Sequence, residues 1–358
     1  MSPVDPVALG IRMLLTVLTG LLVNTLRPAV VAPQQGVSMA VTRLAAQPWH
    51  GPGAEQWRKM ASIVPRSYLC RRVDPDKPVS LADADIRTAE AWAHAPWTDQ
   101  FVDIEGNRKP EPCWQTRAKM LWDDEALYVG AWMEEPQVVA TLREQNSVIF
   151  HDNDFEVFVD AQASNHNYYE FEVNALNTRW ELRLNKPYKN GGNEHSERVG
   201  MSGQGSLPNL RTSVVVDGAI NDASVRDTGW GVVVKIPFLD MVAAGHCARP
   251  PAPGEYWRIN MSRVQWLWES RAGEWIKVPR PGHGNDGEDN WVWSAQGIIN
   301  MHCPERWGFV NFAKGLENEA VGGRALALRG GREEEWMARE VLMASHYLLQ
   351  VFLFFIFF

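Results

Sequence analysis

The segment FHDNDFEVFVD, residues 150–160, places several acidic and amide side chains between large apolar residues. Asp154 and Glu156 are two residues apart, so on a β-strand their side chains would lie on one face, about 7 Å apart. Carboxylates in that arrangement could act as the acid and base of a glycosidase, hold a metal ion, or accept hydrogen bonds from sugar hydroxyls. They could also be only the solvated face of a strand. The elements that position them decide between these four interpretations.

Alternation of apolar and polar residues predicts that this segment is a strand with two different faces. Phe155, Val157 and Val159 occupy alternate positions and should lie in the core, since successive side chains of a strand point to opposite sides. Asp154 and Glu156 fall between them. We therefore expect both carboxylates on a polar, solvated face.

A second run, YYEFEVN, repeats the alternation and predicts a hairpin closed by the loop AQASNHN. In the simplest register Glu156 lies opposite Glu172, and Asp154 lies opposite Asn174. Directly opposed like charges destabilise a strand pair. We therefore expect compensation by a neighbouring Arg or Lys, by a cation, or by a ligand rich in hydroxyl donors.

Further alternating runs, separated by Gly, Asn, Asp and Pro, fill residues 66–313. The clearest are KMLWDDEALYVGAWM, which predicts two strands around an Asp-Asp turn, and RWELRL, TSVVVDGAI, GWGVVVKIP, YWRINMSRVQW and GFVNF. About nine or ten strands at this spacing indicate an all-β domain, a two-sheet antiparallel β-sandwich of jelly-roll-like type. The helical period of REEEWMAREVLMASHYLL adds a short C-terminal helix.

The two ends of the chain differ in composition from this domain. Residues 1–40 contain the apolar stretch IRMLLTVLTGLLV, which is compatible with a signal peptide, a transit segment or sequence ahead of the true start codon. Residues 41–65 are expected to be a linker, and residues 314–358 a helical and apolar tail. The last apolar run is shorter than the ~20 residues that span a bilayer, so no stable membrane span is expected. The expected location is secreted or organellar.

Overall composition argues against several classes of partner and site. The net charge is −8, and no basic run could follow a phosphate backbone, so nucleic acid is not an expected partner. The four cysteines are widely spaced without a C-x-x-C pair, which argues against a zinc ribbon or a thioredoxin-like site. The 17 tryptophans can supply both core volume and flat surfaces for stacking on a ligand.

A glycine-rich loop, GHGNDGEDN, gathers a second set of acidic residues, Asp286, Glu288 and Asp289. Calcium takes six to eight oxygen ligands and tolerates irregular loops, so these residues are candidate metal ligands. The spacing does not match an EF-hand, and an ordinary solvated loop is the alternative. Structural calcium is the only cofactor that the sequence suggests.

The closing segment, EDNWVWSAQGIINMHCPERWGF, holds the aromatic candidates Trp293 and Trp307. Proteins bind sugars by packing C–H groups on aromatic rings beside amide and carboxylate side chains. The same rings could instead fill the core of a sandwich. Both interpretations remain open at this stage.

Taken in order, the blocks KMLWDDEALYVGAWMEEP, HDNDFEVFVD, YYEFEVNALNTRWEL, GWGVVVKIPF, WRINMSRVQW and WVWSAQGIINMHCPERWGFVNF resemble the family 9 carbohydrate-binding module-like domains. The resemblance runs from about Val73 to Phe312. It implies a two-sheet β-sandwich of the DOMON-like group that can carry structural calcium. It also implies, for the members attached to xylanases, a sugar held between two aromatic rings and fixed by charged and amide side chains.

Carried over by position, the resemblance places the sugar-holding glutamate at Glu156. The first ring of the clamp falls at Phe150, which we expect at the rim of the polar face, and the second falls near Met301. The arginine of the family falls at Glu172, a reversal of charge. This sequence therefore keeps the scaffold and part of the known clamp.

The function that these observations favour is non-catalytic binding of carbohydrate through an aromatic and acidic face. The expected ligand is a plant or microbial polysaccharide or its ends. One alternative is a glycoside hydrolase acting on O-glycosyl bonds in carbohydrate catabolism. The other is a structural sandwich with a vestigial sugar site. Catalysis is less favoured because Asp154 and Glu156 would approach a sugar from one surface, whereas glycosidase carboxyl groups flank the bond.

Overall fold

The computed structural model describes residues 54–107, 109–192, 207–279 and 287–315. The chain divides into two compact units, residues 1–62 and 63–358. In the first unit a single helix is described, α3 (Ala54–Ala61), which lies within the predicted linker. The predicted targeting segment, and the C-terminal tail beyond residue 315 with its helix, lie outside the described residues.

The second unit is built almost entirely of strands, as predicted. Its strands are β1 (Ser67–Arg72), β2 (Val102–Asp103), β3 (Thr116–Trp122), β4 (Ala126–Glu134), β5 (Asp154–Asp160), β6 (Tyr168–Asn174), β7 (Arg179–Leu184), β8 (Arg211–Asp217), β9 (Gly229–Pro237), β10 (Tyr256–Gln265), β11 (Trp268–Arg271), β12 (Glu274–Lys277), β13 (Asp289–Val292) and β14 (Gly308–Phe312). Its short helices are α4 (Phe238–Ala243), η1 (Glu90–Trp92), η2 (Ile149–His151), η3 (Tyr188–Asn190) and η5 (Pro304–Arg306).

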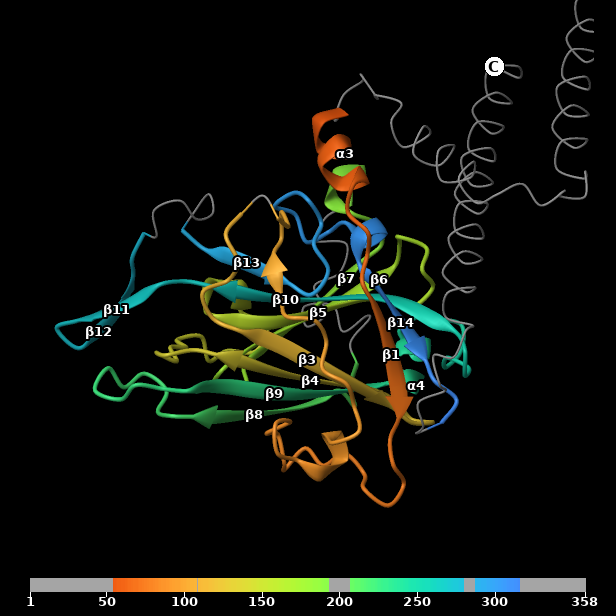
Figure 1. The fold of residues 1–358 in the computed structure, drawn as a ribbon, viewed down its shortest axis with the longest axis horizontal. Coiled ribbons are helices and arrows are strands. Elements are labelled where there is room, and N and C mark those ends of the chain that lie inside the picture. The colour runs from red at the N-terminus through yellow and green to blue at the C-terminus, as the bar shows by residue number, and fades with distance from the viewer. Residues whose placement is uncertain (1–53, 108, 193–206, 280–286, 316–358) are drawn as a thin grey trace, which may run out of the picture. The chain divides into compact units, whose positions relative to one another are not determined.

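These strands form a curled sheet whose two halves make the layers of a sandwich (Figure 1). One layer runs β7-β6-β5-β10-β14-β1, and the other runs β1-β3-β4-β9-β8. β13 pairs with β10 and β2, and β11 pairs with β12 in a separate hairpin. The predicted two-sheet β-sandwich is confirmed.

Strand β1 joins the two layers. Its first part, Ser67 to Cys70, pairs with β14, and its last two residues, Arg71 and Arg72, pair with β3. Both pairings are parallel, which adds an exception to the otherwise antiparallel pattern. Parallel neighbours need a long connection, and the remainder of the domain supplies it between β1 and β14.

The core between the layers follows the alternation seen in the sequence. Phe155, Val157 and Val159 of β5 are fully buried in it, as predicted, and so is Val129 of β4. Trp293 packs its ring edge-on against Tyr68 in the same cluster, while Gly308, with no side chain, makes room for that indole. Large apolar side chains removed from water here provide the main driving force for folding.

Both outer faces of the sandwich carry smaller apolar clusters. Residues of the segment before β2, including the fully buried Trp92, pack against one face of β3 and β4. On the other layer, Phe158 and Tyr168 pack against Trp307, with ring centroids 5.5 and 5.1 Å apart. This second cluster buries the face of β5 and β6 that the sequence predicted to be solvated. That prediction was wrong, because alternation shows which residues share a face and not what covers it.

A buried ion pair holds the end of β4 to β10. Arg263 Nη2 lies 3.2 Å from Glu135 Oε2, and both side chains are almost completely removed from solvent. Glu135 also accepts hydrogen bonds from Gln265 Nε2 and Asn153 Nδ2, each at 2.8 Å. A buried charge is tolerated when it is paired and hydrogen-bonded in this way.

The four cysteines are all unbridged. None of the helices in the described ranges has the length and apolar character needed to cross a bilayer.

Candidate functional site

The β5–β6 hairpin has the register that the sequence predicted. Glu156 lies opposite Glu172, and Asp154 lies opposite Asn174. The loop between the strands is shaped by Asp160, whose carboxylate accepts hydrogen bonds from the backbone N–H groups that follow it. Two of its asparagines adopt positive φ, which this residue type tolerates better than most.

Three carboxyl groups converge on the outer face of this hairpin. One oxygen from each of Asp154, Glu156 and Glu172 lies within 4.8 Å of the other two. The three residues are 0%, 4% and 2% exposed, respectively. We call this group the carboxylate cluster. It is a compact, water-poor arrangement and not the open polar face that was predicted.

Few hydrogen-bond donors reach the carboxylate cluster. Asp154 Oδ1 accepts from the backbone N–H of Val264 at 3.2 Å, and Glu172 Oε2 accepts from that of Phe150 at 3.1 Å. Asp154 Oδ2 and Glu156 Oε2 have no hydrogen-bond partner in the structure. Buried carboxylate oxygens without a partner are costly to the fold.

Burial and mutual repulsion control the protonation of the carboxylate cluster. Burial raises the pKa of Glu156 to about 7, and the charge of Glu288 adds to the increase while the Ser262 hydroxyl opposes it. Burial, followed by the charge of Glu156, raises the pKa of both Asp154 and Glu172 well above their usual range. Removing water from a carboxyl group disfavours its charged form, and a like charge nearby has the same effect.

Asn174, a predicted sugar ligand, is fully used by the fold. Its amide nitrogen donates to Asp152 Oδ2 at 2.9 Å and to the Leu142 carbonyl at 2.8 Å. Its oxygen accepts from the backbone N–H groups of Leu176 and Thr178. These bonds close the turn after β6, so Asn174 positions the backbone beside the cluster and offers no remaining group to a ligand.

The β11–β12 hairpin follows β10 (Figure 1). Aromatic side chains at this point bond to residues next to the carboxylate cluster, and a lysine lies against their rings. Lys277 Nζ lies 3.5 Å from the ring centroid of Trp266 and 5.4 Å from that of Trp268. Phe150 and His151, at the end of η2, have ring centroids 4.8 Å apart. We call these five residues the rim. Phe150 is half-buried, in keeping with the expected position beside the cluster.

Indole N–H groups fix the rim to the strand that carries the carboxylates. Trp266 Nε1 donates to the Phe150 carbonyl at 2.8 Å, and Trp268 Nε1 donates to Asn153 Oδ1 at 3.2 Å. The same amide oxygen accepts the backbone N–H of Trp266 at 2.7 Å. These bonds hold the Trp268 ring next to the start of β5.

Sequence reasoning missed Trp266, Trp268 and Lys277. The signal was present in WLWESRAGEWIK, where apolar and charged residues alternate on both sides of Ala-Gly. Ala272 and Gly273 adopt positive φ of 52° and 85°, the backbone conformation of a tight hairpin turn. Ala rarely adopts positive φ, so the sequence pattern gave no signal of a turn at Ala272.

The two tryptophans that the sequence singled out are core residues here. Trp293 is 1% exposed and lies between the layers. Trp307 is completely buried in the outer apolar cluster that contains Phe158 and Tyr168. Trp307 Nε1 donates to the carbonyl of Met301, the residue expected near the second clamp position. Because their faces pack against protein, neither ring is available for stacking on a sugar in this structure.

The structure describes only part of the acidic loop that was predicted to bind calcium through Asp286, Glu288 and Asp289. Asp286 lies outside the described residues. Glu288 is half-buried and accepts a hydrogen bond from Asn290 Nδ2 at 3.4 Å, and Asp289 is the buried first residue of β13. Calcium binding by this loop stays a prediction.

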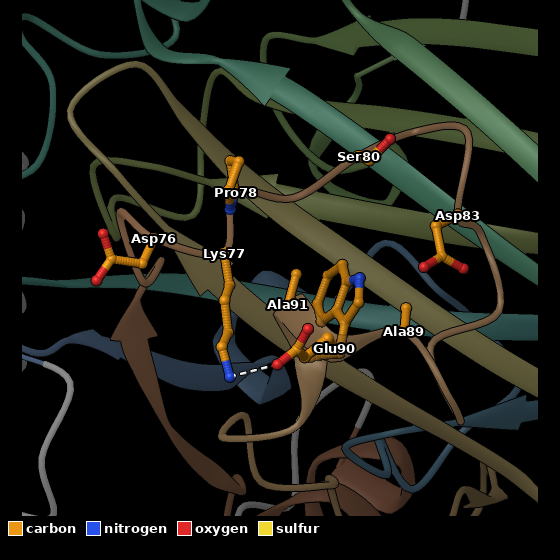
Figure 2. Close-up of a pocket in the computed structure, with 9 residues that line it drawn as sticks. Asp76, Lys77, Pro78, Ser80, Asp83, Ala89, Glu90 and Ala91 are labelled. Carbon is orange, nitrogen blue, oxygen red and sulfur yellow. Dashed lines mark ion pairs between the residues drawn. The ribbon is translucent and has the colours of Figure 1, made fainter.

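A pocket of about 180 Å³ lies in the segment between β1 and η1 (Figure 2). Lys77 and Glu90 form an ion pair of 2.5 Å at its wall, and Ser80 and Asp83 line another side. Its one aromatic residue, Trp92, is completely buried. This pocket offers no exposed ring, and it includes none of the carboxylate cluster.

Comparison with known proteins shows what the domain is similar to. Residues 83–248 match the family model described as carbohydrate family 9 binding domain-like. Similar solved structures include a candidate carbohydrate-binding protein from Bacteroides uniformis, with 15% identity and a TM-score of 0.46 over 70% of this chain and 100% of that one. Another is a family 9 carbohydrate-binding module from Caldicellulosiruptor kristjanssonii in complex with cellotriose, with 14% identity and a TM-score of 0.37 over 72% and 96% of the two chains.

No curated protein matches the chain. The family match ends before β10, β13 and β14, which complete the layer that carries the carboxylate cluster. It includes both strands of the β5–β6 hairpin. The resemblance seen in the sequence is confirmed over residues 83–248, which match the carbohydrate family 9 binding domain-like model.

Proposed function

We propose that this protein binds carbohydrate without cleaving it, and that the ligand contacts the rim beside the carboxylate cluster. The observation that carries the proposal is the family match over residues 83–248, which includes both strands of the acidic hairpin. The proposed ligand class is a plant or microbial polysaccharide, bound along the chain or at its ends.

The chemistry of the rim is suited to such a ligand. The half-buried rings of Phe150 and Trp268 can pack against the C–H groups of a sugar ring. Lys277 and His151 offer donors to sugar oxygens, and Glu288 offers an acceptor to sugar hydroxyls. The hydrogen bond from Trp268 to Asn153 orders the indole before binding, which lowers the entropy lost on association.

The geometry does not favour the glycosidase alternative. Glycosidase carboxyl groups flank the scissile bond, roughly 5 Å apart for retention and farther for inversion, and their pKa values are driven apart. Here the three carboxyl groups crowd together on one sheet face. Burial raises the pKa of all three in the same direction.

Titration of the full chain with cello- and xylo-oligosaccharides, together with a glycan array and a reducing-sugar assay, tests the proposal. We expect binding without sugar release, and about tenfold weaker binding for Trp268→Ala, equivalent to about 1.4 kcal/mol. Trp97→Ala is a matched control, because Trp97 is 36% exposed and also carries a lysine, Lys119 Nζ, 4.4 Å from its ring centroid.

Each other outcome has a distinct meaning. Release of reducing sugar would establish the hydrolase alternative. Absence of binding to every glycan tested would favour the other alternative, a structural sandwich with a vestigial sugar site. Equal losses in Trp268→Ala and Trp97→Ala, or no loss in Trp268→Ala, would remove the rim from the binding site.

A further inference from the structure

We propose that Asp154, Glu156 and Glu172, together with the hydroxyl of Ser262, bind a divalent cation of the calcium type. The site goes beyond carbohydrate binding and does not depend on it. It also differs from the loop that the sequence suggested for calcium, because its ligands lie on three paired strands of one sheet.

The strand register builds the site. Glu156 on β5 lies between Glu172 on β6 and Ser262 on β10, each directly opposite it in the sheet. The three side chains therefore form a row on one face, and Asp154 lies two residues along β5 on the same face. Ligands on hydrogen-bonded strands are held more rigidly than ligands on a loop.

The spacing of the oxygens suits calcium. One oxygen from each carboxyl group lies within 4.8 Å of the others. Calcium binds oxygen at about 2.3–2.6 Å, so ligands on opposite sides of the ion are at most about 5 Å apart. Magnesium binds at about 2.1 Å in a stricter octahedron and would require the oxygens to move closer.

Atoms without partners point to a ligand independently of the acidic residues. Ser262 is completely buried, and although its hydroxyl favours the charged form of Glu156, its Oγ makes no hydrogen bond of normal geometry in the structure. It faces Glu156 from the neighbouring strand. A buried hydroxyl and buried carboxylate oxygens left without partners are costly, and a cation coordinated by them removes that cost.

Acidic neighbours add negative charge around the cluster. Glu170 on β6, Asp152 before β5 and Glu288 before β13 all act on these carboxyl groups with the same sign. The charge of Lys277 interacts with that of Asp154, and the Lys277 ammonium lies against the ring of Trp266.

The other basic residues of β10 face different acids. Arg263 pairs with Glu135, and the charge of Arg258 acts on Asp160. On the other side of the cluster, Trp180 of β7 lies opposite Glu172. A doubly charged ion would supply the compensation that these neighbours do not.

The donor set indicates the class of ion. All four proposed ligands are oxygens, which favour calcium, magnesium or manganese over zinc or copper. Among these three ions calcium has the longest bonds to oxygen, so it best accommodates separations of up to 4.8 Å. Coordination would be completed by water or by oxygens of a bound ligand.

Calorimetric titration of the EDTA-treated full chain with calcium, and separately with magnesium and manganese, tests the proposal. We expect calcium to bind more tightly than magnesium and to raise the melting temperature. Glu172→Gln should weaken calcium binding at least tenfold, whereas Glu288→Gln, in the alternative acidic loop, should weaken it much less, because Glu288 acts on the cluster only through its charge. Ser262→Ala is a second, smaller change that tests the site if Glu172→Gln fails to fold.

Absence of calcium, magnesium and manganese binding to the wild-type chain would overturn the proposal. Unchanged calcium affinity in folded Glu172→Gln would do the same, and loss only in Glu288→Gln would move the ion to the loop. Glycan binding is measured in separate titrations with and without calcium. A protein that binds calcium and no sugar would therefore refute the proposed function alone.

Discussion

Replacing Glu156 by Gln should stabilise the metal-free domain at pH 8 and leave its stability almost unchanged at pH 5. Burial raises the pKa of Glu156 from the ordinary 4.5 to about 7. Because the folded-state pKa is raised, its contribution to stability is fully present below the unfolded pKa and is lost as the pH rises through 7. At about 1.4 kcal/mol per pH unit, the wild type loses about 3 kcal/mol by pH 8.

Glutamine has nearly the same shape and cannot ionise, so it avoids this loss. It gives up the favourable interaction of the carboxylate with the Ser262 hydroxyl. We therefore expect a net gain of about 1–3 kcal/mol in the free energy of unfolding at pH 8. With saturating calcium the sign should reverse, because the variant has lost a proposed ligand of the ion.

Urea denaturation measures the free energy of unfolding under four conditions: pH 5 and pH 8, each in EDTA and in calcium. Glu111→Gln removes an exposed carboxylate and serves as the control, with no expected change. Lower stability of Glu156→Gln at pH 8 in EDTA would refute the reasoning. That result would mean that the charged form of Glu156 is compensated within the protein without an added ion.

Three further changes test the scaffold. Val157→Asp would bury an unpaired charge in the core at a cost of several kcal/mol, and circular dichroism should show an unfolded domain. Arg263→Met would leave Glu135 buried without its ion-pair partner and should cost about 3–5 kcal/mol in a urea titration, so an unchanged midpoint would contradict the assigned pair. Gly308→Ala would place a Cβ 2.4 Å from Trp293 Cζ3 and should lower the unfolding free energy by about 1–3 kcal/mol, whereas a neutral result would mean that the indole can shift freely.

Much of the fold was predictable from local sequence patterns. Alternation with period two located β5 and β9 at their observed bounds, and the same pattern placed Phe155 and Val157 in the core. The register of Glu156 opposite Glu172 was also predictable, because a one-residue slip would move a whole apolar face into solvent. Short-range periodicity carries this information because side chains alternate along every strand.

Only the tertiary structure decided what each face contacts. Trp307 reaches the outer face of β5 from far along the chain and packs on Phe158, which turns a face expected to be wet into a second apolar cluster. Contacts of the same long-range kind placed Trp293 in the core and brought Trp268 and Lys277 to the rim. The sequence by itself determined which residues share a strand face. Burial, and with it the protonation and ligand chemistry of the carboxylates, depends on segments that meet only when the chain folds.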